Sequence, residues 1–151
     1  MHDLLAVKDG IVAKGFPELA LMDLSLKYED LDDAYFEFDR IRKGRYHIDV
    51  DITLHKAPLG VLEGGMAHEL AHISEDCKRG GLAHRADMIL YSIFPAYETR
   101  DERKADMLAV KRGYGAQLLE FLKYANQRRE DFTVEDGLTV EELERLLPKD
   151  R

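Results

Sequence analysis

The chain has little cysteine, no long apolar run and no signal-peptide pattern, and each absence narrows the class of protein. Cys77 is the single cysteine among 151 residues, so an internal disulfide is excluded and a reducing compartment is favoured. No apolar stretch approaches the length of a membrane span. The N-terminus lacks a basic region followed by an apolar one, the pattern of a signal peptide. We therefore expect a cytoplasmic protein with no membrane partner.

An excess of positive charge is also missing. The net charge is −8, from 30 acidic and 22 basic residues, which argues against a general binder of nucleic acid or of anionic membranes. Hydrophobic residues make up 45% and charged residues 34% of the chain, as in ordinary soluble globular proteins. The length fits one domain with a sizeable core, and no repeat divides it. The sequence predicts a single domain over residues 1–151.

The first third of the chain predicts a helix and three strands. Helical spacing over residues 3–14 ends at a glycine and a proline. Apolar and polar residues alternate over 20–28 and 46–54, and residues 34–41 are rich in aromatics. Residues 42–45 have the length and the glycine of a hairpin loop.

Helical spacing dominates the rest of the chain. A helix is predicted from Pro58 to about Asp76, with a buried stripe of Leu62, Met66, Leu70 and Ile73. Gly64 and Gly65 each destabilise it by about 1 kcal/mol relative to alanine. Either another backbone approaches closely there, or the helix begins later, near Gly65.

Further helices are predicted over 82–93, 98–112 and 116–128. A polar loop over 130–137 precedes a short helix that is capped at Thr139 and ends before Pro148. Three strands followed by a helical half give an α+β fold, with a small three-stranded sheet packed on the helix that begins at Pro58.

That helix contains the motif around which the chain is organised, His68-Glu69-Leu70-Ala71-His72. On a helix, His68 and His72 share one face, so both imidazoles can reach one metal ion. Glu69 lies beside that site, where it can take a proton from a water molecule at the metal. Zinc suits two imidazoles and makes such a centre hydrolytic. The alternative is a surface helix with two solvated histidines.

A catalytic zinc usually has three protein ligands. Glu102-Arg103-Lys104-Ala105-Asp106 is the best source of the third, because Glu102 and Asp106 share a face of a predicted helix. Glu102 could bind the metal while Asp106 accepts the second N–H of a ligand histidine. Without the upstream motif, Glu102 and Asp106 would be interpreted as solvated acids that pair with nearby basic residues on a helix surface.

These two segments resemble the gluzincin metallopeptidases, whose signature is H-E-x-x-H with E-x-x-x-D. The continuation from Ala105 to Tyr114 is similar to a stretch of the CAAX-prenyl-protease and HtpX-like group, and the small size resembles its soluble archaeal minigluzincins. The resemblance covers roughly residues 46–122. It implies a zincin-like fold, zinc on His68, His72 and Glu102, Glu69 as general base, and Asp106 supporting His68.

The chain departs from this group near its C-terminus. Many relatives carry a histidine or an arginine there that stabilises the tetrahedral intermediate, but no histidine follows His84. Arg145, in a helix resembling that segment, and Tyr114 are the two candidates for this role, and the sequence does not choose between them.

Two other classes of metallopeptidase share the H-E-x-x-H motif but take their third ligand from elsewhere in the chain. In SprT-like metallopeptidases a later histidine is the third ligand, which makes His84 the rival of Glu102. Those proteins usually carry a basic, DNA-directed surface, unlike this acidic chain. Metzincins need a histidine where this chain has Lys78, so that class is excluded. His47, His55 and Cys77 are interpreted as surface, turn or partly buried residues.

The sequence thus predicts a zinc-dependent peptidase that acts on extended or unfolded polypeptides. A peptide is expected to add to a free edge of the strand at 46–54. The alternative is a latent or regulatory zinc protein, in which residues 131–151 fold back over the cleft as a plug or form a contact between copies of the chain.

Overall fold

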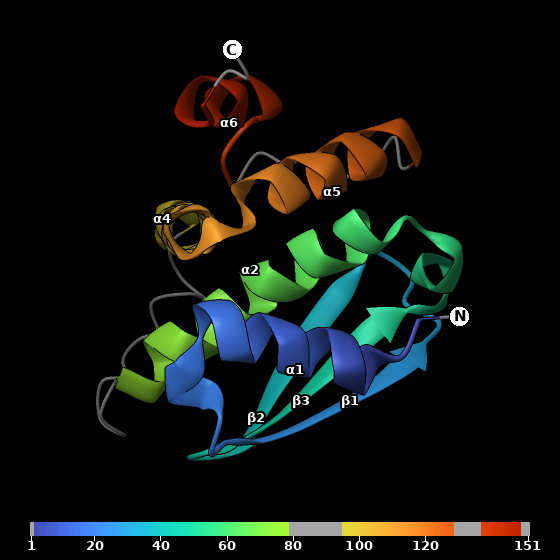
Figure 1. Ribbon diagram of the computed structural model, residues 1–151, viewed down its shortest axis with the longest axis vertical. Helices are drawn as coiled ribbons and strands as arrows, with labels where there is room; N and C mark the ends of the chain where they lie inside the picture. Colours follow the sequence, from blue (N-terminus) through green and yellow to red (C-terminus); the bar gives the residue numbers. More distant parts are fainter. Residues whose placement is uncertain (1, 79–94, 129–136, 149–151) are drawn as a thin grey trace.

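The computed structural model describes residues 2–78, 95–128 and 137–148. It is an α+β structure with a small mixed sheet and a helical half (Figure 1). Helix α2 (Leu59–Lys78) lies between the sheet and helix α5 (Gly115–Arg128), and α1 (Leu4–Gly15) packs against α2 and the sheet. Asp3 caps α1 by accepting hydrogen bonds from the amides of Leu5 and Ala6, which confirms the predicted first helix.

The sheet contains β1 (Asp23–Glu29), β2 (Phe36–Arg42) and β3 (Arg45–Asp51) in the order β1-β3-β2. β1 runs parallel to β3 and β2 antiparallel to it. The hairpin loop, with Gly44 at a φ of 80°, sets β2 directly beside β3. The connection between β1 and β2 then leaves β1 on the other side of β3. Our expectation of a free edge on β3 is therefore wrong, because both of its edges are paired; β2 is an edge strand of the described sheet.

β1 begins later than the alternation predicts, at Asp23 rather than at residue 20. Pro17–Leu19 forms a 3-10 helix, and the amide of Met22 donates to the carbonyl of Leu19 at 3.0 Å. This local turn takes up the residues that the alternation assigned to the strand.

β3 ends earlier than predicted, at Asp51 rather than at Leu54. The Asp51 side chain accepts a hydrogen bond from the amide of Thr53 at 3.1 Å and caps a 3-10 helix, Ile52–Lys56. The turn exposes 40% of Ile52, which the alternation placed inside, and still buries Leu54 completely.

Helix α2 is the centre of the core. The predicted stripe of Leu62, Met66, Leu70 and Ile73 is fully buried. A Cβ on Gly64 would lie 2.1 Å from the carbonyl oxygen of Gln117 in α5, and one on Gly65 would lie 2.1 Å from the ring of Phe36 in β2. The predicted close backbone approach is therefore found at Gly64, and α2 runs through both glycines rather than beginning later.

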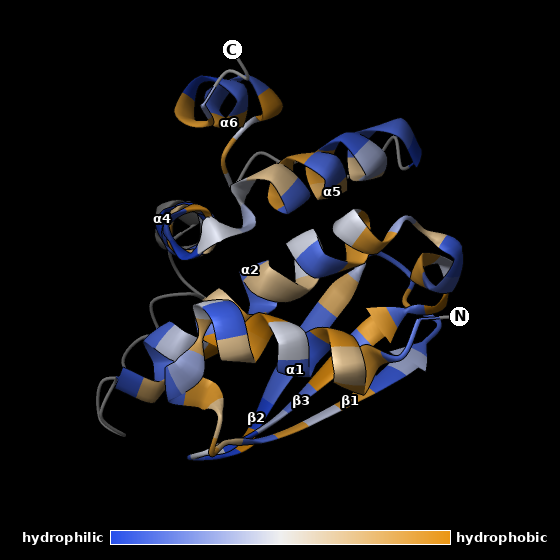
Figure 2. Ribbon diagram, in the orientation of Figure 1, coloured by the Kyte–Doolittle hydropathy of each residue, from blue (hydrophilic) through white to orange (hydrophobic). Residues whose placement is uncertain are grey.

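Of the remaining helices, α4 (Pro95–Ala109) and α5 contact α2, and α6 (Val140–Leu146) lies beyond α5 (Figure 1). α4 leads into a π-helical turn, Val110–Tyr114, which is kinked at Gly113 (φ of 92°), and α5 follows at once. α6 begins with the predicted cap at Thr139 and packs on α5. Helices α1, α5 and α6 each carry apolar and polar faces (Figure 2). The predicted helix over 82–93 lies outside the described residues, as does most of the loop predicted over 130–137.

Candidate metal centre

Two histidines of α2 and one glutamate of α4 bring three ligand atoms together. The Nε2 atoms of His68 and His72 lie 3.1 Å apart. Glu102 places one carboxylate oxygen 3.0 Å from His68 Nε2 and the other 3.1 Å from His72 Nε2. All three side chains are half-buried, and together they could hold a metal ion. The two histidines share one face of a helix, as their spacing predicts, and Glu102 meets that face from α4.

The separations fit a small tetrahedral ion. Ligands at about 2.0–2.1 Å from a tetrahedral centre lie about 3.3–3.4 Å from one another. The observed separations of 3.0, 3.1 and 3.1 Å need only a few tenths of an ångström of adjustment. The two Glu102 contacts use different oxygens of its carboxylate, so a cation held between the two imidazole nitrogens would meet one or both of these oxygens.

Asp106 lies behind His68, one helical turn after Glu102. One of its carboxylate oxygens is 2.7 Å from His68 Nδ1, and only 2% of Asp106 is exposed. With the proton on Nδ1 donated to this carboxylate, the lone pair of Nε2 faces His72 and Glu102. The structure thus places Asp106 where an outer carboxylate orients a ligand histidine.

The charges around His68 favour a cation. Burial alone would lower the pKa of His68, but the carboxylates of Asp106 and Glu102 outweigh it and raise that pKa well above its ordinary value. For Glu102, burial would raise the pKa, but hydrogen bonds and charge from His68 and His72 lower it far below its usual range. A site that holds a proton this firmly attracts a metal ion by the same charges, provided that the imidazole gives up its proton.

Glu69 follows His68 in α2 and is half-buried. Burial raises the pKa of Glu69; the charges of Glu102 and Asp106 add to this rise, while His68 and His72 oppose it. A carboxylate with a raised pKa is a stronger base than an ordinary one. Glu69 therefore combines a place beside the ligands with a useful affinity for protons.

Phe38 of β2 is a neighbour of the site that the sequence did not reveal. Its ring stacks on the ring of His72, with centroids 5.8 Å apart and planes 23° apart. The aromatic residues over 34–41 predict a strand but give no sign of this contact, which depends on how β2 packs against α2. The edge strand β2 therefore borders the candidate metal centre.

The other predicted residues lie elsewhere. Tyr114 is buried on the side of α1, where its ring packs on Phe16 with centroids 6.4 Å apart. Arg145 is exposed on α6. No contact within the described part of the chain joins Tyr114 or Arg145 to the three ligand atoms, so the partner of an oxyanion stays a prediction. His84, the rival third ligand, lies outside the described residues.

Three further side chains that the sequence singled out, His47, His55 and Cys77, form contacts away from the ligand atoms. His47 binds Ser25 and Asp49 on the sheet. His55 contacts the carbonyl of Ile52 in its own 3-10 turn. Cys77 is partly buried and lies 3.4 Å from the hydroxyl of Tyr46. Among the described residues, none of these contacts joins the three side chains to the ligand atoms of His68, His72 and Glu102.

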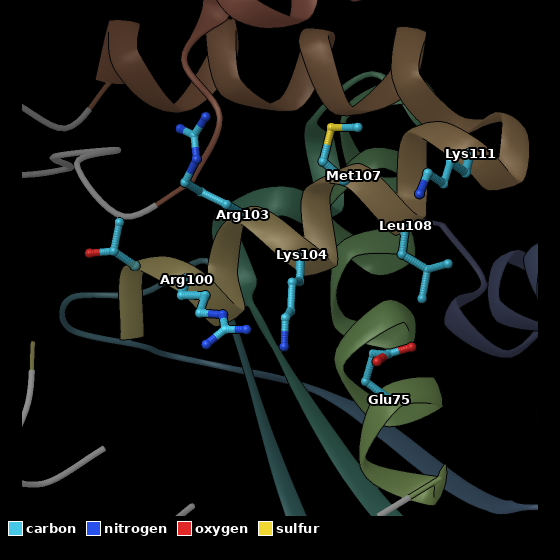
Figure 3. A pocket seen from close by; sticks show the side chains of 8 residues that line it. Glu75, Arg100, Arg103, Lys104, Met107, Leu108 and Lys111 are labelled. Atoms are coloured by element: carbon cyan, nitrogen blue, oxygen red, sulfur yellow. The ribbon is translucent and has the colours of Figure 1, made fainter. Parts of the chain in front are cut away.

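The outer side of α4 lines a cavity of about 680 Å³ (Figure 3). Its lining is basic and apolar: Arg100, Arg103, Lys104 and Lys111 with Met107 and Leu108, together with Thr99 and with Glu75 of α2. Arg103 extends from this wall toward the chain that leads into α6 (Figure 3). The three ligand atoms take no part in this cavity, so α4 serves the metal centre on one side and a basic surface on the other.

Comparison of the chain with protein-family models, with curated proteins and with solved structures found no match. No helix within the described ranges combines the length and the apolar character needed to cross a membrane. Function is therefore inferred from the geometry of the site and from the two motifs.

Proposed function

We propose that the chain is a zinc-dependent peptidase with a zincin-like fold, remotely related to the gluzincins. The observation that carries this proposal is the meeting of His68, His72 and Glu102 within 3.1 Å of one another, with Glu69 beside them on α2. The two contributing helices are those that bear the H-E-x-x-H and E-x-x-x-D motifs. Motif and geometry thus support the same ligand set.

Zinc is the metal that this donor set suits best. Two imidazoles and one carboxylate form a common catalytic set for zinc, with a fourth position left for water. Magnesium and calcium prefer oxygen ligands, and soft ions such as copper(I) prefer sulfur. When bound, zinc supplies a Lewis acid that polarises the carbonyl of a peptide and lowers the pKa of a water molecule.

The chain's own residues supply the proton transfers. Glu69 takes the proton of the attacking water and hands it to the amine that leaves when the peptide bond breaks. Its raised pKa suits both steps, because the group must first accept the proton and then release it. Asp106 keeps the His68 ring in place through Nδ1 and takes no part in the proton transfer.

An extended peptide would bind along β2 rather than β3. β2 is paired on one side only within the described sheet, and it carries Phe38 against His72. A peptide that adds as a further strand gains main-chain hydrogen bonds, while pockets along the edge select its side chains. Such a site favours unfolded or flexible substrates.

The test compares wild type with Glu69→Gln on casein in the presence of zinc. Glutamine keeps the size and polarity of the side chain, so the fold and the metal should be retained while cleavage is lost. Zinc content, measured by elemental analysis, should be about one ion per chain in both proteins. Full zinc retention by a His68→Ala, His72→Ala double variant would place the metal elsewhere, and equal cleavage by Glu69→Gln would remove the proposed base.

A further inference from the structure

Asp106 joins two distant parts of the chain. One carboxylate oxygen is 2.7 Å from His68 Nδ1, and the other accepts a hydrogen bond of 2.7 Å from the backbone amide of Leu138. The second bond is buried, and both Asp106 and Leu138 are almost fully enclosed. A carboxylate held at both oxygens cannot rotate without breaking a buried hydrogen bond.

The amide of Leu138 is itself held in place from α4. Arg103 donates to the carbonyl of Gly137 at 3.0 Å and forms a two-pronged contact with Glu142, at 2.8 and 3.1 Å. Glu142 also accepts from the amide of Thr139 and completes the cap of α6. Hydrogen bonding to the guanidinium of Arg103 lowers the pKa of Glu142 to about 2, so the carboxylate is ionised throughout the neutral range.

Apolar packing fixes the rest of the segment. Leu143 of α6 is fully buried, and a Cβ on Gly115 would lie 2.5 Å from Leu147. The described part of the C-terminal segment, residues 137–148, therefore docks on α4 and α5. Its hydrogen bonds reach the metal centre through Asp106.

We propose that the segment Gly137–Leu147 is a positioning element of the metal centre: the Leu138 amide fixes Asp106, which in turn fixes the ring of His68. This inference rests on the metal site of the proposed function. Partners outside the ligand shell typically change metal affinity about 10- to 100-fold when they are removed. The Leu138 amide acts one step further out, and its loss should weaken zinc binding about tenfold.

The coupling is reciprocal. If docking of the C-terminal segment strengthens zinc binding, zinc must strengthen docking by the same factor. The metal should therefore slow hydrogen exchange at the Leu138 amide and protect the segment from proteolysis. Release of the segment would weaken the metal centre rather than simply open it.

The experiment compares Leu138→Pro with Leu138→Ala. Both variants lose the leucine side chain, but only proline removes the N–H that Asp106 accepts. Zinc affinity is measured by competition with a chelator, and circular dichroism checks the fold. We expect Leu138→Pro to bind zinc about tenfold more weakly than Leu138→Ala. In NMR spectra of the zinc-loaded proteins, the His68 Nδ1 proton should exchange with water faster in the proline variant than in the alanine variant.

A second pair of variants tests the same proposal if the proline variant does not fold. Arg103→Met removes the contacts to Gly137 and Glu142, whereas Lys104→Met removes a neighbouring charge on α4 whose ion pair within the described residues is with Asp101, at 3.6 Å. Arg103→Met should weaken zinc binding and abolish the zinc-dependent slowing of exchange at Leu138; Lys104→Met should do neither, and Arg103→Lys should restore part of the effect.

The outcomes separate this inference from the proposed function. Equal zinc affinity and equal exchange of the His68 proton in the proline and alanine variants would overturn the positioning role while leaving the metal site intact. If Leu138→Pro does not fold, the same equality between Arg103→Met and wild type overturns it. A wild-type protein that binds no zinc at His68 and His72 overturns both proposals.

Discussion

Phe38 and His72 stack across the junction between β2 and α2, with ring centroids 5.8 Å apart. The contact fixes the ring of a candidate metal ligand against the edge strand along which we propose that a peptide binds. Under the proposed function, one aromatic side chain would therefore both orient a ligand and border the bound peptide.

Phe38→Ala should weaken both functions moderately. Aromatic pairs contribute about 0.5–1.5 kcal/mol beyond the burial of their area, which corresponds to up to about tenfold in zinc affinity. The KM for an unfolded substrate should rise as well, because the wall of the site is lost. Ile41→Ala on the same strand is the control, since 55% of Ile41 is already exposed. Equal zinc affinity in the two variants would show that the stacking does not orient His72.

The third ligand can be separated from its rival by single substitutions. Glu102→Ala should lose most zinc affinity, because it removes the oxygen that lies 3.0 Å from His68 Nε2. His84→Ala should bind zinc as wild type does. Chelator competition measures both affinities. The reverse pattern would favour the SprT-like arrangement.

Zinc binding should depend on pH through His68. Its pKa is raised well above the ordinary 6.5, because the carboxylates of Asp106 and Glu102 outweigh the effect of burial. A metal needs the neutral imidazole, so binding must release a proton, and the affinity should fall as the pH drops through the raised pKa. Calorimetry in buffers of different ionisation enthalpy measures the released proton. A binding enthalpy that is independent of the buffer at neutral pH would contradict the predicted protonation of His68.

The raised pKa of His68 also affects the stability of the metal-free protein, which is measured in the presence of a chelator. There a rise in pH lowers the stability, whereas it strengthens zinc binding. A group whose pKa is raised on folding stabilises the protein fully below its unfolded pKa of about 6.5, and this contribution is lost as the pH rises through the folded value. We therefore expect the metal-free protein to lose stability as the pH rises from about 6.5 through the raised pKa of His68. His68→Gln should flatten that part of the profile of Tm against pH.

Gly64 and Gly10 form a matched pair for stability. Alanine at Gly64 would gain about 1 kcal/mol in helix propensity, but its Cβ would lie 2.1 Å from the Gln117 carbonyl, and overpacking typically costs about 1–3 kcal/mol. The net result should be a lower free energy of unfolding. Gly10→Ala meets nothing within 4 Å and should stabilise α1 by up to about 1 kcal/mol. Urea unfolding of both variants checks the two signs.

Local periodicity predicted the elements well because it reports which face of a segment is buried. The stripe from Leu62 to Ile73 and the cap at Thr139 both follow from short-range pattern and side-chain chemistry, and both are found. The ends of β1 and β3 were missed because side-chain and backbone hydrogen bonds at Asp51 and Leu19 override the alternation.

Local periodicity could not predict the order of the strands in the sheet or the residues that surround the site. Alternation in β3 is the same whether the strand is central or at an edge, so it could not show that β1 pairs beside it. The bond from Leu138 to Asp106 spans a large separation in sequence and uses a backbone amide, which leaves no residue-type signal. The motif predicted which side chains of α2 and α4 meet, but not what holds them.

Truncation after Arg129 tests whether the C-terminal segment blocks the cleft. The deletion removes the Leu138 amide and the buried Leu143, so we expect weaker zinc binding and lower stability. Activity must therefore be compared per zinc-loaded molecule, at saturating zinc and after circular dichroism has confirmed the fold. If the segment only supports Asp106, the cleavage of casein per loaded molecule should not exceed that of wild type. If it acts as a plug, cleavage should rise, and Glu69→Gln in the truncated chain should abolish the gain. A folded, zinc-saturated truncation that cleaves no unfolded protein, beside a wild type that is equally inactive, would count against the peptidase itself.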